Sequence, residues 1–181
     1  MSDVLVIIDI QNDYFPGGAM ELDRAEEAGQ AAAKLLARFR AAGLPVVHVQ
    51  HEAKRPGSTF FLPGTPGMDI HPCVTPLPGE KIVRKHFPNS FRDTDLLETL
   101  RGLRATRLTI CGMMTNMCVD AGVRAAADLG FACRVAAGAC AARPLAFGGV
   151  EVPAPQVQAA FLCALSLAYA QVAPAAELDL P

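Results

Sequence analysis

Short continuous apolar runs alternate along this chain with stripes of apolar residues at helical spacing. The runs are rich in β-branched residues, which is typical of buried strands, and they lie at 4–9, 45–50, 82–85, 107–112 and 132–136. The stripes predict helices at about 23–42, 116–129 and 154–169, with a last short strand near 171–173. Strands that alternate with helices predict a three-layer, Rossmann-like α/β fold, in which helices cover both faces of a parallel sheet. We expect a single domain over residues 1–181.

One segment between the second and third predicted strands departs from this rhythm. About thirty residues there are interrupted by many prolines and glycines, too many for a long helix. Loops of this length in compact domains are usually functional or disordered. The apolar cluster Phe60, Phe61 and Leu62 favours a packed lid or a subunit contact over disorder, although simple anchoring of the loop to the core explains it equally well.

Charge and hydropathy exclude two classes of partner. Sixteen Lys and Arg residues against eighteen Asp and Glu residues give a net charge of −2, so no nucleic-acid partner is expected. The run at 4–9 lacks a basic leader and contains Asp9, so it predicts a buried strand rather than a signal peptide. The apolar stretch at 159–170 is shorter than the roughly 20 residues that span a bilayer. We therefore expect no membrane partner and a cytoplasmic location.

The six cysteines form no CxxC pair, and most are expected to be reduced core residues. Cys118 differs because it falls in the first turn of a predicted helix, after Gly112 closes the preceding strand, with Thr115 or Asn116 as the N-cap. Free backbone N–H groups and the helix dipole at that position are expected to lower the pKa of a thiol. Cys111 lies inside the predicted strand and is expected to be core.

Three polar residues lie at or just beyond the ends of predicted strands. Asp9 ends the first strand, Lys85 ends the third, and Cys118 follows the fourth. Ligands of open parallel α/β sheets bind outside the carboxyl ends of the strands. A carboxylate, an amine and a thiol are therefore expected to converge on one edge of the sheet, although each has a structural explanation when taken alone.

Three stretches around these residues carry a resemblance. They read DIQNDYF at 9–15, KHFPNSF at 85–91 and GMMTNMCVDAGVRAAADLG at 112–130. Together they resemble the signatures of the isochorismatase-like cysteine hydrolases, which include nicotinamidases, N-carbamoylsarcosine amidohydrolases and ureidoacrylate amidohydrolases. The resemblance implies a sheet of order 3-2-1-4-5-6.

The resemblance also implies the parts of a catalytic site. It gives a triad of Asp9, Lys85 and Cys118, an oxyanion hole made by the backbone amides of Met114 and Cys118, and a cis peptide between Met113 and Met114. The expected activity is hydrolysis of a small-molecule amide through a thioester, by a homodimer or homotetramer. Cleavage of a vinyl ether, as in isochorismatases proper, and a non-catalytic or redox-sensing role for Cys118 are the alternatives.

The sequence departs from the family pattern at two positions. Gly122 stands where the family often has threonine, and Gly138 where it usually has aspartate. The residues expected to line a substrate pocket are Phe15, Phe60, Phe61, Phe87 and His51. Family nicotinamidases bind a metal through an Asp-x-His pair after the second strand, and His51 and Ala53 occupy the matching positions here. We therefore expect neither a metal nor another cofactor.

Overall fold

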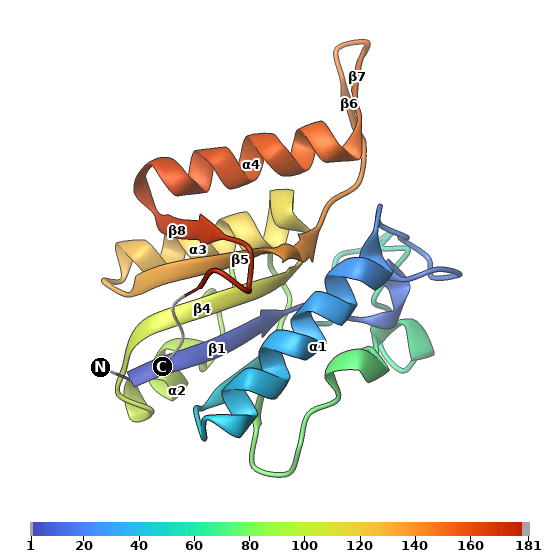
Figure 1. Ribbon diagram of the computed structural model, residues 1–181. Coiled ribbons are helices and arrows are strands. Elements are labelled where there is room, and N and C mark those ends of the chain that lie inside the picture. The colour runs from blue at the N-terminus through green and yellow to red at the C-terminus, as the bar shows by residue number, and fades with distance from the viewer. Residues whose placement is uncertain (1, 179–181) are drawn as a thin grey trace.

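The computed structural model describes residues 2–178 and has a parallel six-stranded sheet at its centre (Figure 1). The order of the strands is β3-β2-β1-β4-β5-β8, so the implied order is confirmed, with β8 as the sixth strand of the sheet. The sheet strands are β1 (Ser2–Ile8), β2 (Val46–His51), β3 (Lys81–Lys85), β4 (Ala105–Met113), β5 (Ala132–Ala141) and β8 (Ala170–Ala173). The flanking helices are α1 (Ala25–Ala41), α2 (Leu96–Gly102), α3 (Asp120–Asp128) and α4 (Ala154–Ala168).

Alternate side chains of the central strand divide the core into two parts. Leu5 and Ile7 of β1 pack in the cluster that contains the buried stripe of α1, whereas Val4, Val6 and Ile8 pack in the cluster with α2, α3 and α4. Successive side chains of a strand point to opposite faces of its sheet, so both faces of β1 are covered. Full burial on both sides is the reason why this strand reads as a continuous apolar run.

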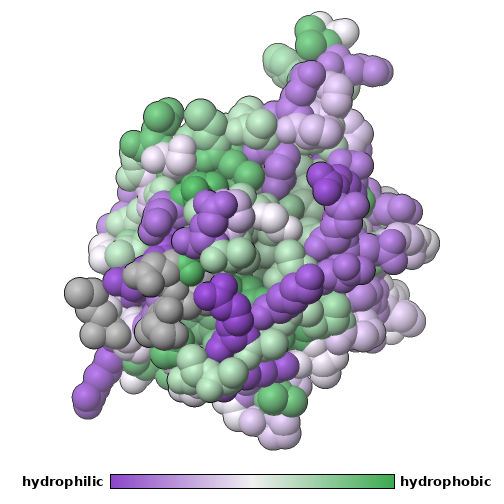
Figure 2. Space-filling view, viewed as in Figure 1, coloured by the Kyte–Doolittle hydropathy of each residue, from purple (hydrophilic) through white to green (hydrophobic). Residues whose placement is uncertain are grey.

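Helix α1 forms where the sequence predicts it. Its apolar stripe is buried and consists of Ala28, Ala32, Leu35, Leu36 and Phe39. Gly43 follows the helix with φ of 66°, a left-handed conformation that glycine adopts readily and that ends the helix. Figure 2 shows a band of hydrophilic side chains over the outward face of α1, whereas much of the surface around α4 is hydrophobic.

Apart from short 3-10 turns, two parts of the fold were not predicted from the sequence. One is the short helix α2, which buries only Leu96 and Leu100. The other is an antiparallel hairpin of β6 (Leu145–Phe147) and β7 (Val150–Val152), which projects from the body of the protein next to α4 (Figure 1). Phe147 at its tip is 91% exposed.

The long segment between β2 and β3 is packed against the sheet end. Gln11 and Ile70 form an isolated antiparallel bridge. The backbone N–H of Phe61 donates a hydrogen bond of 2.6 Å to Oδ2 of Asp13, and the Phe61 side chain is fully buried. Leu62 is exposed, so Phe61 is the residue of this apolar cluster that anchors the segment to the core.

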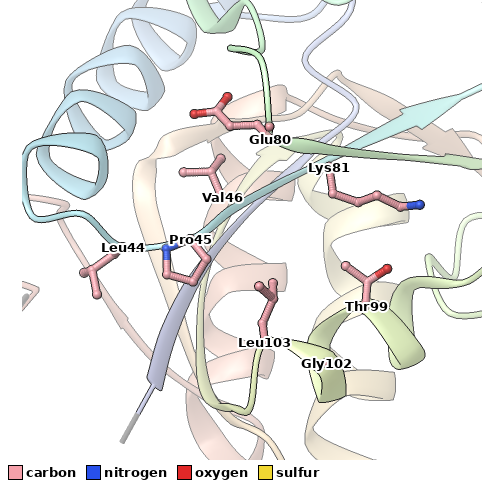
Figure 3. A pocket seen from close by; sticks show the side chains of 9 residues that line it. Leu44, Pro45, Val46, Glu80, Lys81, Thr99, Gly102 and Leu103 are labelled. Atoms are coloured by element: carbon pink, nitrogen blue, oxygen red, sulfur yellow. The ribbon is translucent and has the colours of Figure 1, made fainter.

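Two surface cavities lie apart from the strand ends that carry Asp9, His51 and Lys85. One, of about 330 Å³, lies at the amino ends of β2 and β3, and Figure 3 shows Pro45, Lys81 and Leu103 around it. The other, of about 490 Å³, lies between α1, β5 and α4 and includes Gly138 in its lining. Within residues 2–178, none of the helices is long and apolar enough to cross a bilayer.

Candidate active site

Four adjacent strands direct polar residues to one edge of the sheet. Asp9 directly follows β1, His51 and Lys85 are the last residues of β2 and β3, and Cys118 lies in the short helix after β4. Because the strands are parallel and neighbouring, their carboxyl ends meet at the same edge. The predicted convergence of Asp9, Lys85 and Cys118 is therefore present in the fold.

A close approach between β1 and β4 brings the two central strands together at the site. A Cβ atom at Gly112 would lie 2.0 Å from the carbonyl oxygen of Ile8, and φ of Gly112 is 142°. Only glycine fits both the space and the backbone conformation. The peptide bond between Met113 and Met114, just beyond Gly112, is cis, as the resemblance implies.

The segment that carries Cys118 is a π-helical turn, Thr115–Val119, which continues into α3. Val119 N–H donates to the carbonyl of Met114 at 3.3 Å, five residues back. The expected N-cap is wrong: Met114 occupies the cap position, and the Thr115 hydroxyl instead donates to the carbonyl of Ala141 at 3.1 Å. This bond ties the turn to β5.

Asp9 and Lys85 form a fully buried ion pair. Nζ of Lys85 lies 2.8 Å from Oδ2 of Asp9 and donates a hydrogen bond of 3.0 Å to the carbonyl of Pro88. Both side chains are 0% exposed. Burial acts to lower the pKa of Lys85, but the negative charge of Asp9, joined by that of Cys118 once its thiol is ionised, outweighs burial, so the net pKa is raised and the ammonium stays charged.

Cys118 lies against this pair and is 5% exposed. Burial raises the pKa of the Cys118 thiol to about 12, the Asp9 carboxylate adds to the increase, and Lys85 acts in the opposite direction. The lowered pKa expected from the helix position is therefore wrong for the free protein. Desolvation and the adjacent carboxylate disfavour a second negative charge more strongly than the helix end favours it.

His51 completes the cluster. One ligand atom each from Asp9, His51 and Cys118 lie within 4.8 Å of one another. Burial lowers the pKa of His51, so its imidazole is neutral near pH 7.

Gln11, which was not among the predicted site residues, holds the backbone of His51 in place. Its Oε1 accepts a hydrogen bond of 2.7 Å from the backbone N–H of His51. Its Nε2 donates to the backbone carbonyls of His51 at 2.9 Å and of Met68 at 2.7 Å. Gln11 is fully buried. A polar residue just after a buried strand was the available signal, because burying an amide is costly unless it is hydrogen-bonded.

Comparison with known proteins assigns this arrangement to a family. Residues 3–173 match the isochorismatase domain. The chain belongs to the isochorismatase family.

Three relatives show how similar this isochorismatase-family chain is to known proteins in sequence and in fold. It is 48% identical over 172 residues to the isochorismatase family protein YddQ of Bacillus subtilis, a match that covers 95% of this chain and 96% of YddQ. A solved structure from Oleispira antarctica, assigned to the isochorismatase hydrolases, has a TM-score of 0.95 at 53% identity and covers 98% of this chain and 95% of the other. A ureidoacrylate amidohydrolase of Methylobacterium radiotolerans is 28% identical over 153 residues, which cover 66% of this chain and 59% of that enzyme. The protein is therefore a hydrolase of the isochorismatase family.

In this isochorismatase-family protein, aromatic side chains lie next to the cluster of Asp9, His51 and Cys118. Phe61 packs edge-on against Tyr14 at 4.6 Å between ring centroids and against Phe60 at 4.9 Å, and its ring lies 5.8 Å from that of His51. Burial raises the pKa of Tyr14 well above its ordinary value, and the nearby Asp9 carboxylate and, when ionised, the Cys118 thiol add to this effect. Tyr14, which was not among the expected pocket residues, therefore lies close to the site.

Two of the expected pocket residues have other surroundings. Phe15 is buried against Gly29 of α1 and stacks on His71 with 3.6 Å between ring centroids, so its contacts are those of a core residue. Phe87 is half-buried, and the guanidinium of Arg92 lies 3.7 Å from its ring centroid. These contacts leave Phe60, Phe61 and His51 as the expected pocket residues with contacts at the site.

The metal site of family nicotinamidases does not fit this chain. Ala53 carries no ligand atom, and its backbone N–H is bonded to the Phe61 carbonyl at 2.9 Å. His51 points into a cluster with Asp9 and Cys118 instead of pairing with a histidine two residues later. The pair that binds the nicotinamidase metal is therefore absent at these two positions.

Proposed function

We propose that this hydrolase cleaves a C–N amide bond of a small molecule through a thioester on Cys118. The observation that carries the proposal is the cluster of a buried carboxylate, a buried ammonium and a nearly buried thiol at the carboxyl edge of the sheet. A thiol with an adjacent base is the usual arrangement for nucleophilic catalysis. The name of the ureidoacrylate amidohydrolase relative supports amide chemistry.

In the first half-reaction, Asp9 takes the Cys118 proton as the sulfur attacks the amide carbonyl. The S–C bond forms, and the backbone amides of Met114 and Cys118 donate hydrogen bonds to the oxyanion. The C–N bond then breaks, and Asp9 returns the proton to the departing amine. Lys85 stabilises the negative charge that moves between the carboxylate and the sulfur.

In the second half-reaction, a water molecule replaces the amine. Asp9 removes one proton from the water. The water oxygen then attacks the thioester carbonyl, and the S–C bond breaks. The released sulfur regains its proton from Asp9, so the site returns to its starting state with a carboxylic acid as the second product. A single carboxylate thus serves as base and acid in both halves.

The test is the release of ammonia or amine from a panel of small amides, combined with intact-mass measurement. A turned-over amide should leave a transient acyl adduct, whose mass identifies the acyl group, and the adduct should map to Cys118. Amide turnover that persists at the wild-type rate in Cys118→Ala would disprove the mechanism.

The isochorismatase reaction is the competing activity within the family. Vinyl ether cleavage releases no amine and forms no thioester, so the same panel separates the two reactions when an enol ether is included. Redox sensing by Cys118 is the non-catalytic alternative, and it predicts a peroxide-dependent mass increase on Cys118 without turnover of any amide. The buried Asp9 carboxylate beside the thiol favours hydrolysis over sensing, because nucleophilic catalysis needs an adjacent base and sensing does not.

A further inference from the structure

Asp9, His51 and Cys118 have the chemistry of a metal-binding cluster. Each offers a ligand atom, and the three atoms lie within 4.8 Å of one another. A carboxylate, an imidazole and a thiolate are ligands that zinc prefers, and thiolate and imidazole disfavour magnesium and calcium. The three residues come from the ends of three different strands or the turns beyond them, so their meeting is not a result of local spacing.

A second observation points to a missing partner at the same place. Both carboxylate oxygens of Asp9 are completely buried, and among residues 2–178 the Lys85 ammonium, 2.8 Å from Oδ2, and the Cys118 thiol are the polar groups beside them, so no well-formed hydrogen bond satisfies Oδ1. Buried carboxylate oxygens without partners are rare in folded proteins. Asp9 thus keeps one oxygen available for a ligand while the other remains paired.

We propose that Asp9, His51 and Cys118 bind one zinc ion and that the bound ion reversibly inhibits the hydrolase. The binding does not depend on the activity, whereas the inhibition rests on the proposed function. On binding, the Cys118 S–H bond breaks, its proton passes to solvent and a sulfur–zinc bond forms, with no change of oxidation state. The sulfur lone pair that would attack the amide then belongs to the metal bond.

Small movements bring the ligands to zinc geometry. Zinc bonds of about 2.0–2.3 Å at tetrahedral angles place ligand atoms about 3.5 Å apart, so the cluster must contract by about 1 Å. His51 is the least buried of the three residues and its side chain is the one that can turn inward. The fourth position is left for water, as in zinc sites with an open position.

The charge of Lys85 sets the character of this site. Its ammonium lies beside Asp9 and repels a second cation, which weakens binding relative to a structural zinc site. The cluster is therefore suited to a reversible inhibitor rather than to a permanently bound cofactor. This agrees with a mechanism in which protein groups alone supply the base and the oxyanion donors.

Cobalt titration tests the binding without reference to activity. Co²⁺ serves as a spectroscopic probe for zinc, and the reduced, metal-free full chain should give a thiolate-to-cobalt absorption band with one ion per chain that Zn²⁺ displaces and Mg²⁺ does not. The band should disappear in Cys118→Ser. In His51→Gln the affinity should fall by at least about tenfold, since even outer-shell changes cost about 10–100-fold.

The matched control is a second His–Cys pair. Nδ1 of His71 lies 3.1 Å from Sγ of Cys73, but no third ligand joins these two in the described part of the chain. The Cys73→Ser variant should therefore keep the band. A band that survives in Cys118→Ser and vanishes in Cys73→Ser, or no band in the unaltered protein, would overturn the proposal.

Inhibition is measured separately once an amide substrate is found. Micromolar Zn²⁺ should suppress turnover, Mg²⁺ should not, and a chelator should restore the original rate. Binding without any amidase activity would sustain the zinc site and reject the proposed function. Amidase activity that Zn²⁺ leaves unchanged would sustain the proposed function and reject the inhibition.

Discussion

The buried ion pair offers a direct test of the energetics of this site through Lys85→Met. The substitution removes the ammonium that lies 2.8 Å from Oδ2 of Asp9 and leaves a fully buried carboxylate without a countercharge. Breaking a buried pair in this way costs about 3–5 kcal/mol, because the remaining charge keeps its desolvation penalty. For a chain of this size, about 2–4 °C of Tm corresponds to 1 kcal/mol, so Tm should fall by roughly 6–20 °C.

The matched control is Lys81→Met, which removes the partner of Asp95 on the surface. That ion pair is as short, at 2.6 Å, but its side chains are 46% and 49% exposed. Water screens such pairs, and their contribution is about 0–1 kcal/mol. Urea unfolding of both variants measures the difference, and the double variant Asp9→Asn with Lys85→Met should recover most of the loss because neither charge then remains buried.

The pH dependence follows from the direction of the Lys85 shift. Its pKa is raised above the ordinary value of 10.5, so the stability from its charged form is fully present below that pH and is lost as pH rises through the higher folded-state pKa. The difference in unfolding free energy between the wild type and Lys85→Met should therefore stay constant at neutral pH and shrink in strong alkali. A loss in Lys85→Met no greater than in Lys81→Met would refute this reasoning.

Further outcomes concern the thiols, one glycine and the metal. Cys118→Ala should abolish turnover with little change in stability, whereas Cys111→Ala, at a fully buried position, should lose about 1 kcal/mol of stability and keep its activity. Gly122→Ala should raise the unfolding free energy by about 0.5–1 kcal/mol, because alanine favours the helix more than glycine does. The added Cβ would meet only the tip of the Ile8 side chain at 3.2 Å and the Ser90 hydroxyl at 3.5 Å, and a lower Tm would contradict this expectation. Dialysis against a chelator should leave turnover unchanged, and a loss that zinc, iron or manganese restores would show that a metal is required.

The central sheet could be predicted from the sequence because its strands are buried on both faces. Such strands are continuous apolar runs, and β1 and β4 are each flanked by polar or glycine residues that mark where the runs end. The same rule placed Asp9, Lys85 and Cys118 at one edge, since the carboxyl ends of neighbouring parallel strands are close in space.

The elements that were missed lack this signal. Helix α2 has seven residues and buries two leucines, too few to establish a helical period. The apolar residues Leu145, Phe147 and Val150 of the β6–β7 hairpin are exposed, so burial does not pattern its sequence. The Gly148-Gly149 pair between its strands, where both φ angles are positive, was the available signal for a hairpin turn. The role of Gln11 depends on partners 40 and 57 residues away, which local patterns cannot reveal.

The pKa of Cys118 was predicted in the wrong direction for a related reason. Its position near a helix start is local and readable, but the burial that raises its pKa to about 12 comes from side chains contributed by distant segments.

A neutral resting thiol changes how the site must work. Because Asp9 and Lys85 are already paired, the free site holds one negative and one positive charge, and a thiolate would add a second negative charge where only 5% of the cysteine reaches water. Proton transfer from the sulfur to Asp9 keeps the total charge constant, so it avoids that penalty. It becomes favourable only when a carbonyl is in place to accept the sulfur electrons. In the proposed mechanism, the burial that suppresses the free thiolate therefore couples activation of the nucleophile to the presence of substrate, and Lys85 stabilises the charge on either group.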